Sequence, residues 1–256
     1  MINKWLRAGV SEDGKWSKTE VGTPQGAVIS PLLANVYLHY VLDQWVQHWR
    51  NKTAKGDVII VRYGDDFVAG FQHRWEAERF LTELKARMSR FGLALHPDKT
   101  RLIEFGRFAS DNRRKRGMGK PETFDFLGFT HICASSRDKT CFHIRRRTAK
   151  KRFRATLAKV KEVLRIRMHE PTIEVGPWLQ RVVLGYYQYH AIPGNWEILN
   201  SFRYEITRYW LKVLRRRGQK RRMNWAKFSP LISLWIPVPK LAHPYPNVRF
   251  DAKHPR

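Results

Sequence analysis

Apolar positions in the first part of the chain predict two helices. Ser30 and Pro31 form a helix-start signal, because a serine before a helix and a proline at its first position are both favoured. Residues 32–50 carry apolar side chains nearly all round this predicted helix, so we expect it to be buried. Apolar residues then recur every three or four positions over 75–91 and predict an amphipathic helix that ends at Gly92.

Short apolar runs between and after these helices predict strands. The β-branched run at 58–61 is followed by a break at 64–66 and a second run at 67–69, which indicates a strand, a tight turn and a second strand. Two acidic residues lie at the tip of this predicted hairpin. Further short strands are expected at 101–105, 123–132 and 140–144, with an irregular charged loop at 111–120.

From Arg145 onward the predicted strands give way to helices. Helical periodicity is present at 148–168, 177–190 and 196–217, so we expect a separate helical module. The segment 230–246 holds five prolines, which predict an extended tail over this module. Strands followed by helices indicate an α+β protein.

The charge is very uneven along the chain. The 256 residues hold 49 Lys and Arg against 22 Asp and Glu, a formal net charge of +27, to which residues 1–100 contribute only +3. Eleven basic residues and one acid lie in 145–167, and nine basic residues and no acid lie in 208–227. Solvated helix faces usually mix both signs, so these stretches favour binding of a polyanion such as nucleic acid, with a plain solvated face as the alternative.

The composition also excludes several classes of protein. With 43% hydrophobic residues the chain can bury a core, so we do not expect a disordered protein. No apolar run reaches the roughly 18 to 20 residues of a membrane span, and the first residues do not resemble a signal peptide. We therefore expect a cytoplasmic protein with no membrane partner. Cys133 and Cys141 lack the spacing of a zinc knuckle and are expected to be reduced thiols.

Asp65 and Asp66 are the candidate metal ligands. Adjacent carboxylates repel each other, and in an apolar frame a divalent cation is a favourable way to neutralise them. Their hard oxygens suit Mg2+, and two such ions roughly 4 Å apart can activate a 3′-hydroxyl and stabilise a departing pyrophosphate. A plain Gly-Asp-Asp turn without metal is the alternative.

Five short motifs follow one another along the chain. They are Gly22-Thr23-Pro24-Gln25-Gly26, Ser30-Pro31-Leu32-Leu33-Ala34-Asn35, Tyr63-Gly64-Asp65-Asp66, His96-Pro97-Asp98-Lys99-Thr100 and Phe126-Leu127-Gly128-Phe129. In this order and spacing the chain resembles the reverse transcriptases of group II introns. The resemblance covers essentially the whole chain, because it continues through Gly185-Tyr186-Tyr187-Gln188-Tyr189-His190 and His243-Pro244-Tyr245-Pro246.

The resemblance implies a protein of two parts. Residues 1–144 are expected to form part of a reverse transcriptase palm, with antiparallel strands and packed helices. Residues 145–256 are expected to form the helical thumb and maturase region, which binds RNA. The implied function is RNA-directed DNA synthesis together with maturase activity in intron splicing and mobility. A non-catalytic, RNA-binding maturase remnant that assists intron folding is the alternative.

The resemblance also assigns roles to residues near the acidic turn. Asp65 and Asp66 are implied to be catalytic ligands of a two-Mg2+ site, with Asp65 the stronger candidate. Lys99 is implied to neutralise or protonate the leaving pyrophosphate, with an ordinary surface lysine as the alternative. The implied nucleotide- and template-binding residues are Gln25, Gly26, Tyr63 and Gly64. Gln25 has the alternative role of bracing its own loop, and the family more often has alanine in place of Gly64.

Two further groups of residues are implied to hold nucleic acid. The residues implied to support the end of the primer are Phe126, Leu127, Gly128 and Phe129, for which a simple core strand is an equal alternative. The candidates for phosphate contacts with intron RNA and the template–primer duplex are Arg145, Arg146, Arg147, Lys150, Lys151, Arg152 and Arg154. Core packing is favoured over base stacking for Tyr186, Tyr187 and Tyr189.

A two-metal polymerase site needs carboxylates from two strands. In reverse transcriptases the second strand precedes the segment that residues 22–26 match, and this sequence begins too late to include it. Asp57 lies about 26 Å from Asp65 along the same predicted strand and cannot replace the missing residue. We therefore expect catalysis to need an upstream fragment that supplies the other Asp.

Overall fold

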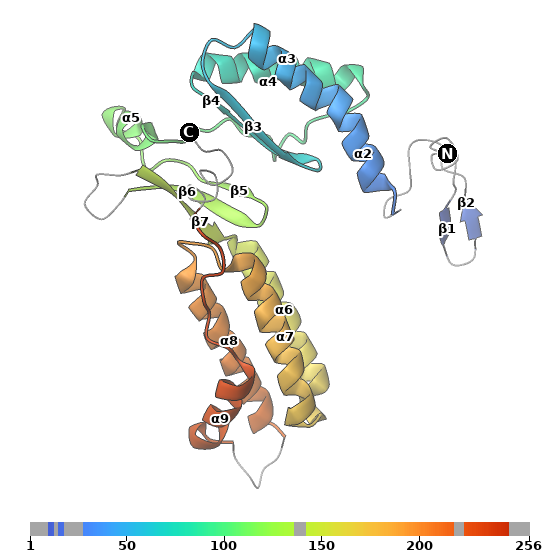
Figure 1. Cartoon of the computed structure of the whole chain (residues 1–256), viewed down its shortest axis with the longest axis vertical. Helices are drawn as coiled ribbons and strands as arrows, with labels where there is room; N and C mark the ends of the chain where they lie inside the picture. Colours follow the sequence, from blue (N-terminus) through green and yellow to red (C-terminus); the bar gives the residue numbers. More distant parts are fainter. Residues whose placement is uncertain (1–9, 13–14, 18–27, 136–141, 218–222, 246–256) are drawn as a thin grey trace. The chain divides into compact units, whose positions relative to one another are not determined.

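The structure is a computed structural model that describes residues 10–12, 15–17, 28–135, 142–217 and 223–245 (Figure 1). It is a mixed α+β protein, as predicted, with three small antiparallel sheets in the described segments. The chain divides into two compact units, Met1–Ile103 and Glu104–Arg256.

The first unit contains two hairpins and a long interrupted helix. Its elements are β1 (Val10–Glu12), β2 (Lys15–Ser17), α2 (Ser30–Leu38), α3 (Gln44–Lys52), β3 (Val58–Tyr63), β4 (Asp66–Phe71) and α4 (Arg74–Arg90). A π-helical segment, η1 (His39–Asp43), joins α2 to α3. β1 pairs with β2 and β3 pairs with β4, both antiparallel. The predicted acidic hairpin and the predicted helix at 75–91 are thus confirmed.

The predicted burial of the first helix is correct only for its second half. None of the residues of α2 is buried, and Tyr40 in η1 is also exposed. Burial begins at Val41 and Leu42 and continues through Val46 and Trp49 on α3. The core of this unit includes these four residues together with side chains of β3 and α4, whereas α2 contributes none.

The β3–β4 hairpin has one covered face and one open face. Val58 and Ile60 pack in the core with side chains of α3 and α4. Figure 1 shows these two helices on one side of the hairpin. The alternate side chains of Ile59, Val61 and Tyr63 are 65%, 52% and 69% exposed. Because side chains alternate between the two faces of a strand, these three share the open face. The acidic tip therefore lies on a hairpin that helices cover on one side.

A buried carboxylate fixes the segment that leads into β3. Glu76, in the first turn of α4, is fully buried and accepts hydrogen bonds from the backbone N–H groups of Lys55 and Gly56 at 2.5 and 3.3 Å. An acidic side chain at a helix N-terminus is also stabilised by the helix dipole. These contacts tie the start of the hairpin to α4.

The second unit combines a small sheet with a helical module. Its strands are β5 (Phe124–Phe126), β6 (Phe129–Ser135) and β7 (Phe142–Thr148), in the antiparallel order β5-β6-β7. Its helices are α5 (Ala109–Lys115), α6 (Lys150–Ile166), the 3-10 segment η2 (Arg167–His169), α7 (Thr172–His190), α8 (Trp196–Arg215) and α9 (Trp225–Trp235). No helix in the described ranges is long and apolar enough to cross a membrane.

Three sequence predictions for the segment from residue 101 to β7 are wrong in detail. Residues 101–105 form no strand, and the charged segment predicted as a loop contains α5. β7 continues to Thr148 instead of ending before Arg145, because it pairs with β6 from Phe142 onward. The border predicted between residues 144 and 145 thus falls inside β7, and a functional division there stays a prediction.

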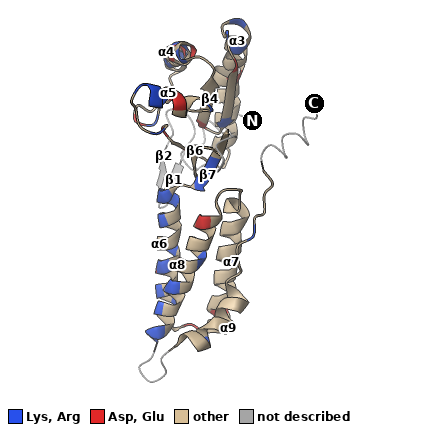
Figure 2. Cartoon of the chain, turned by 90° about the vertical axis from the view of Figure 1, so that its left-hand side faces the viewer, with Lys and Arg blue, Asp and Glu red and all other residues tan. Residues whose placement is uncertain are grey.

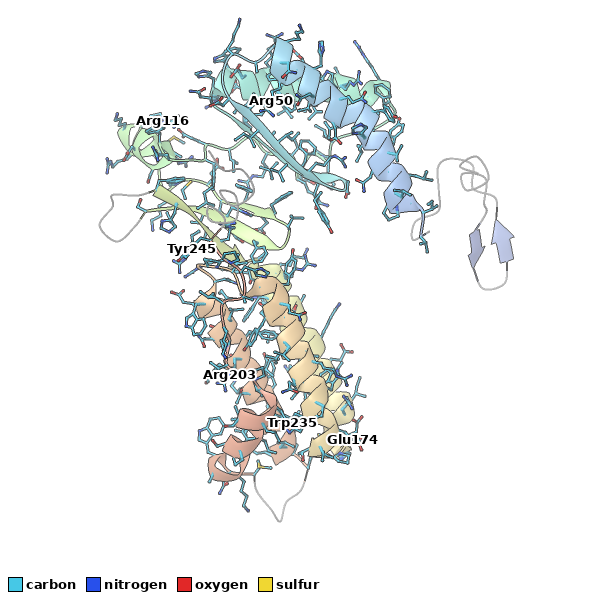
Figure 3. The ribbon with its side chains drawn as sticks, in the orientation of Figure 1. Arg50, Arg116, Glu174, Arg203, Trp235 and Tyr245 are labelled. Atoms are coloured by element: carbon cyan, nitrogen blue, oxygen red, sulfur yellow. The ribbon has the colours of Figure 1, made fainter. Side chains whose placement is uncertain are left out.

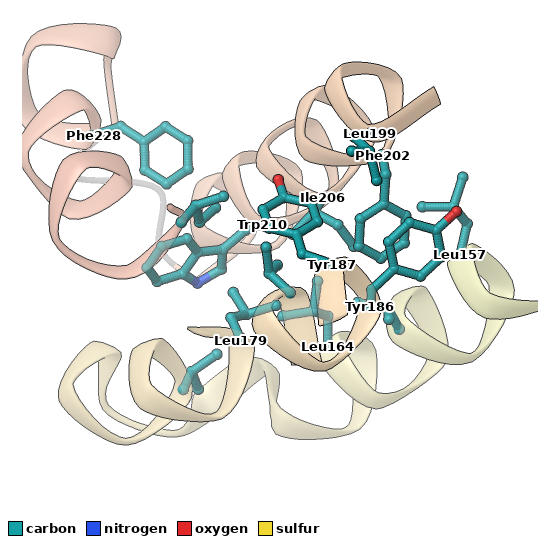
Figure 4. Packing of buried hydrophobic residues seen from close by; sticks show 14 of the residues in the cluster. Leu157, Leu164, Leu179, Tyr186, Tyr187, Leu199, Phe202, Ile206, Trp210 and Phe228 are labelled. Atoms are coloured by element: carbon teal, nitrogen blue, oxygen red, sulfur yellow. The ribbon is translucent and has the colours of Figure 1, made fainter. Parts of the chain in front are cut away.

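The helices α6, α7, α8 and α9 pack around one large apolar core (Figure 4). Tyr186 of α7 stacks on Phe202 of α8 with 3.7 Å between the ring centroids. The buried apolar residues of α8 are Leu199, Phe202, Ile206, Trp210 and Leu214, of which the first four have no exposed surface. Tyr209 and Val213 of the same helix are partly buried and pack against this core.

The predicted tail is helical at its start and extended afterwards. Pro230 lies inside α9, so extended backbone begins only at Ile236. The guanidinium of Arg203 donates to the carbonyls of Ile236 and Pro237 at 3.3 and 3.2 Å (Figure 3). The amide of Ala242 donates to the carbonyl of Ala191 at 3.0 Å. The tail therefore runs back along the module to the end of α7.

The contact between α7 and α9 depends on a glycine. A Cβ atom at Gly176 would lie 2.6 Å from ring atoms of Trp235, which is shorter than any normal carbon contact. Trp235 is the last residue of α9. The absence of a side chain at Gly176 therefore lets the end of α9 pack on the first turns of α7.

Candidate functional site

The acidic pair lies on a two-residue turn. Gly64 and Asp65 connect β3 to β4, and Tyr63 pairs with Asp66 across the hairpin. Gly64 has a φ of 63°, whereas Asp65 is not among the residues with positive φ, which is the pattern of a type II′ turn. Other residues adopt this left-handed conformation at a cost of about 1 to 2 kcal/mol. Glycine at position 64 therefore fits the local backbone.

Both carboxylates of the turn are available to a ligand. Asp65 and Asp66 are exposed, and neither side chain forms a hydrogen bond or ion pair with another residue in the described part of the chain. Tyr63 lies opposite Asp66 on the open face of the hairpin. Two adjacent carboxylates without a cationic partner form a site of strong negative potential, which attracts cations.

The oxygen donors of the turn fit Mg2+ as part of a site. Mg2+ commonly takes one or two carboxylates together with substrate phosphates and water. Asp65 and Asp66 offer such oxygens, but the described residues contain no group of three or more His, Cys, Asp or Glu side chains that could hold a metal. The turn therefore supplies two candidate ligands, and the remaining ligands have to come from elsewhere.

Arg62, which no predicted motif contains, lies directly behind the turn. Its Nε and Nη2 donate to the two carboxylate oxygens of Asp43 at 2.8 and 2.6 Å. Its Nη1 donates to the side-chain oxygen of Asn35 and to the carbonyl of Gly64, both at 2.8 Å. Hydrogen bonding to Arg62 holds the pKa of the Asp43 carboxyl below its ordinary value. An arginine at an inward strand position, directly before Tyr63, is the sequence signal that identifies it.

The part of the chain that the structure describes shows no contact that supports a role for the other residues predicted to bind or act on the nucleotide. Gln25 and Gly26 lie outside the described residues. Lys99 lies exposed in a turn in which the N–H of Thr100 donates to the carbonyl of His96 at 3.0 Å. Its ammonium forms no hydrogen bond or ion pair with the residues that the structure describes. The roles of Gln25, Gly26 and Lys99 stay predictions.

The β5–β6 hairpin also ends in a tight turn, but other elements cover its tip. Leu127 and Gly128 have φ values of 48° and 76°, the pattern of a type I′ turn. The carbonyl of Gly128 accepts the N–H of Ala149 at 2.9 Å, and the carbonyl of Leu127 accepts the hydroxyl of Tyr189 at 2.7 Å. A Cβ atom on Gly128 would lie 3.0 Å from Cδ of Arg152. The start of α6 and the end of α7 therefore hold this turn.

Phe129 packs as a core residue beside this turn. Its buried ring stacks on Tyr189 at 5.5 Å and lies edge-on to His190 at 5.3 Å, between ring centroids. Phe126, at the other end of the turn, is half-buried. These contacts support the core-strand alternative for residues 126–129, and contact with a primer stays a prediction.

Three buried polar residues join β7 to the ends of α7 and α8. Asn195 donates to the hydroxyl of Thr148 at 2.8 Å and to the carbonyl of His190 at 2.9 Å, and it accepts the N–H of Thr148 at 3.0 Å. Nδ1 of His190 lies 3.2 Å from the same hydroxyl. Burial, with a smaller effect from the charge of Arg152, lowers the pKa of His190 to about 4. The imidazole is therefore neutral at pH 7.

Two of the three tyrosines near the end of α7 belong to the core, as favoured from the sequence. Tyr186 and Tyr187 are buried, and this burial raises the pKa of each phenol to about 12. Tyr189 is 49% exposed, but one side of its ring is occupied by Phe129. Base stacking is thus excluded for the two buried rings in this conformation.

The three arginines of β7 have different environments. Arg145 and Arg147 both form ion pairs with Glu197 in the first turn of α8, at 3.3 Å for Arg145. Arg146 lies across the strand pair from His131, and burial lowers the pKa of both side chains. Glu197 neutralises part of the charge of Arg145 and Arg147, so their electrostatic attraction for a phosphate is weaker than that of unpaired arginines. Their contacts with nucleic acid stay predictions.

The predicted basic residues of α6 are more accessible. Exposed side chains of this group are Lys150, Lys151, Arg152 and Arg154. Figure 2 shows Lys and Arg along α6 and on α8, where acidic residues are few. Leu157, Val160 and Leu164 of α6 are buried in the helical core. One face of α6 therefore packs, and the other presents positive charge.

Comparisons with known proteins agree with these features. A 52-residue segment is 50% identical to the group II intron-encoded protein LtrA of Lactococcus lactis subsp. cremoris, covering 20% of this chain and 8% of that protein. A 59-residue segment is 41% identical to the putative COX1/OXI3 intron 1 protein of Saccharomyces cerevisiae, covering 23% of this chain and 7% of that protein. The matches thus span less than a tenth of the length of these curated relatives. The family model for reverse transcriptase (RNA-dependent DNA polymerase) matches residues 1–131, about half of the chain, and the chain therefore belongs to the reverse transcriptase family.

Proposed function

We propose that this chain takes part in RNA-directed DNA synthesis, with Asp65 and Asp66 as ligands of catalytic Mg2+. The observation that carries the proposal is the exposed acidic pair on a type II′ turn, with no partner for either carboxylate among the described residues of a reverse transcriptase family member. Asp65, in the turn itself, is the stronger candidate ligand, and Asp66 at the start of β4 is the second.

The chemistry of this site depends on charge. Bound Mg2+ would favour ionisation of a primer 3′-hydroxyl and offset negative charge on a departing pyrophosphate. Asp65 and Asp66 hold the cation, and the exposed ammonium of Lys99 stabilises or protonates the departing group. Gln25, Gly26, Tyr63 and Gly64 contact the nucleotide and the template.

A complete two-metal site needs a further carboxylate. The described residues contain no third metal-binding side chain grouped with the acidic turn. We propose that a strand upstream of residues 22–26, in the same polypeptide or in a separate chain, supplies an Asp to this site. The resemblance to group II intron reverse transcriptases supports this arrangement.

The rest of the chain binds nucleic acid in this proposal. Residues 1–144 form the palm-like part, in which residues 126–129 support the primer end. Residues 145–256 form the thumb and maturase part, which binds the template–primer duplex and group II intron RNA. The accessible positive charge of α6 supports this assignment. The contacting residues are Arg145, Arg146, Arg147, Lys150, Lys151, Arg152 and Arg154.

Primer extension tests the catalytic role. The full chain is mixed with the upstream segment, a template–primer duplex, deoxynucleotides and Mg2+. Asp65→Asn keeps the size of the side chain but removes its charge, so we expect extension to fall by about a thousandfold or more. Asp57→Asn is the matched control, because Asp57 is an exposed aspartate before the other end of β3. Equal activity of Asp65→Asn and the wild type would refute the catalytic proposal.

The basic face of α6 supports a second candidate function, an RNA-binding maturase that needs no metal. Under this alternative, splicing of a group II intron survives Asp65→Asn but fails when Lys150, Lys151 and Arg154 are changed to Gln. Changing Lys85 and Arg90 on α4, which are exposed and basic, to Gln is the control for lost charge. If both Asp65→Asn and the triple variant support splicing normally, neither site serves the intron.

A further inference from the structure

The guanidinium of Arg62 joins three separate parts of the first unit. It binds Asn35 on α2, Asp43 on η1 and the carbonyl of Gly64 in the acidic turn, and Arg62 itself belongs to β3. Four hydrogen bonds of 2.6 to 2.8 Å engage its Nε, Nη1 and Nη2 atoms. Its side chain is only 15% exposed. These contacts fix the planar group in a single orientation.

The π-helical segment brings the two helical partners to the same guanidinium. Asn35 and Asp43 are eight residues apart, which in an uninterrupted α-helix places them about 80° apart around the axis. The wider π turn at His39–Asp43 rotates the chain less per residue and so reduces this offset. Both side chains can then bind Arg62, and π segments inside helices are frequent at functional sites.

The bond to Gly64 distinguishes this cluster from an ordinary ion pair. The ion pair with Asp43 alone would balance the charge of Arg62 and attach β3 to the helix. The additional bond holds the peptide group that links Gly64 to Asp65, and this group sets the direction in which Asp65 leaves the turn. Since Asp43 neutralises Arg62, the effect on the acidic pair is geometric rather than electrostatic.

We propose that Arg62 is a positioning residue that orients Asp65 for metal binding by holding the Gly64 carbonyl against Asn35 and Asp43. The inference rests on the proposed function, because the orientation of Asp65 affects the reaction only if Asp65 is a metal ligand. The fork of the guanidinium is required, and lysine, with one ammonium, cannot bind the three partners in the same geometry.

Three variants test the proposal in the full chain. Arg62→Lys keeps the positive charge but removes the fork, and Asn35→Ala removes one bond from an exposed side chain while leaving the ion pair with Asp43. Arg79→Lys is the matched control, because Arg79 forms an ion pair with Glu83 on α4 at 2.7 Å. If Arg62→Lys fails to fold, Asn35→Ala carries the test.

The first measurement is hydrogen exchange in the segment 58–71, which requires neither metal nor activity. We expect the amides around the turn to exchange about tenfold faster in Arg62→Lys and Asn35→Ala, with no change in the core of α4 or in Arg79→Lys. Equal exchange at the turn in the wild type and both variants would overturn the proposal.

The second measurement is primer extension in the presence of the upstream segment. We expect kcat to fall by about 10- to 100-fold in Arg62→Lys, because a displacement of a reacting group by about 1 Å has effects of this size. The KM for nucleotide and the Kd for the duplex should stay at wild-type values, which a general loss of structure would not allow.

The two proposals fail in different ways. If Asp65→Asn abolishes extension while Arg62→Lys and Asn35→Ala keep the wild-type kcat, the metal site stands and the positioning role of Arg62 is refuted. If Asp65→Asn has no effect on extension, the proposed function fails and the role of Arg62 in it fails with it. A faster-exchanging turn would then show only that Arg62 stabilises the hairpin.

Discussion

The two hairpins with tight turns, β3–β4 and β5–β6, resemble each other in backbone geometry and differ in what surrounds their tips. Both turns have two residues, and both need a left-handed backbone, at Gly64 in the first and at Leu127 and Gly128 in the second. The carboxylates of the first tip have no described partner, whereas the carbonyls of the second are bound by Ala149 and Tyr189.

This difference separates a turn suited to ligand binding from a turn that supports the fold. The first turn is held from behind by Arg62 and leaves Asp65 and Asp66 exposed. The second turn uses its polar backbone atoms for contacts within the protein, and its neighbour Phe129 is buried. A family motif at a hairpin tip therefore does not by itself identify a ligand site. The polar atoms of the tip also have to be free of hydrogen-bond partners within the protein.

The largest expected effect on stability comes from the polar cluster of Thr148, His190 and Asn195, which anchors β7, the strand that pairs with β6 of the second hairpin. Asn195→Ala removes three hydrogen bonds in a buried site and takes away the partner of the Thr148 backbone N–H, so we expect a loss of about 2 to 4 kcal/mol. Urea unfolding of the full chain measures this loss. Asn200→Ala, on the exposed side of α8, should change stability by less than about 0.5 kcal/mol. Equal losses in the two variants would contradict this account of the anchor.

The same anchor should be sensitive to acid. The pKa of His190 is about 4 in the folded chain against an ordinary value of 6.5, so the unfolded chain binds this proton more readily. The contribution of His190 is therefore fully present above pH 6.5 and is lost as the pH falls through 4, by about 3 kcal/mol in total.

Hydrogen exchange of the segment 142–148 at several pH values checks this effect. Protection should decrease from pH 6.5 to pH 4 more steeply in the wild type than in His190→Gln, which has no imidazole to protonate. Burial also lowers the pKa of His131, so its protonation should account for part of the slope that remains in His190→Gln. Identical slopes in both proteins would show that His190 is not the titrating anchor.

Alanine at the two turn glycines compares the hairpins directly. Gly64→Ala and Gly128→Ala both place a side chain at positive φ, which costs about 1 to 2 kcal/mol. The new Cβ meets nothing within 4 Å at Gly64 but lies 3.0 Å from Arg152 at Gly128, so Gly128→Ala should be the more damaging by a few tenths of a kcal/mol. Thermal unfolding measures both, with Gly119→Ala as a control in open space. The reverse order would contradict the different packing of the two tips.

The smallest effect is expected from Tyr189→Phe. The variant keeps the ring that stacks on Phe129 and removes the hydroxyl that donates to Leu127, so we expect a loss of about 0.5 to 1 kcal/mol. Exchange should rise in the β5–β6 turn and stay constant in the β3–β4 turn. Tyr204→Phe, an exposed position on α8, serves as the control. No difference between the two variants would mean that the bond to Leu127 does not hold the second tip.

The sequence predicts elements well where local pattern decides them. The β-branched run, the Gly-Asp-Asp break and the second apolar run identify β3 and β4, and the periodicity at 75–91 identifies α4. The acidic turn is found in the same way, since glycine and aspartate favour tight turns whatever surrounds them. The exposure of α2 is not predicted, because the apolar pattern of its sequence does not reveal whether other elements cover it.

Tertiary contacts decide the features that the sequence does not reveal. Arg145–Arg147 belong to β7 because β6 provides partners along the whole strand, although the strand predicted from the sequence ends at residue 144. Pro230 is accepted within α9, where the helical core supports the turns around it. The contacts of Arg62 join residues 19 and 27 positions apart, so no local motif contains them.

The π segment at His39–Asp43 acts as a one-residue insertion in an otherwise regular helix. Deleting one residue there would restore α-helical hydrogen bonding and leave Asn35 and Asp43 seven residues apart, which is about 20° around the axis. Both side chains would still face Arg62, and Val46 and Trp49 would keep their places in the core. The extra residue is thus absorbed where it occurs, and the helix on either side of it keeps its alignment with the acidic turn.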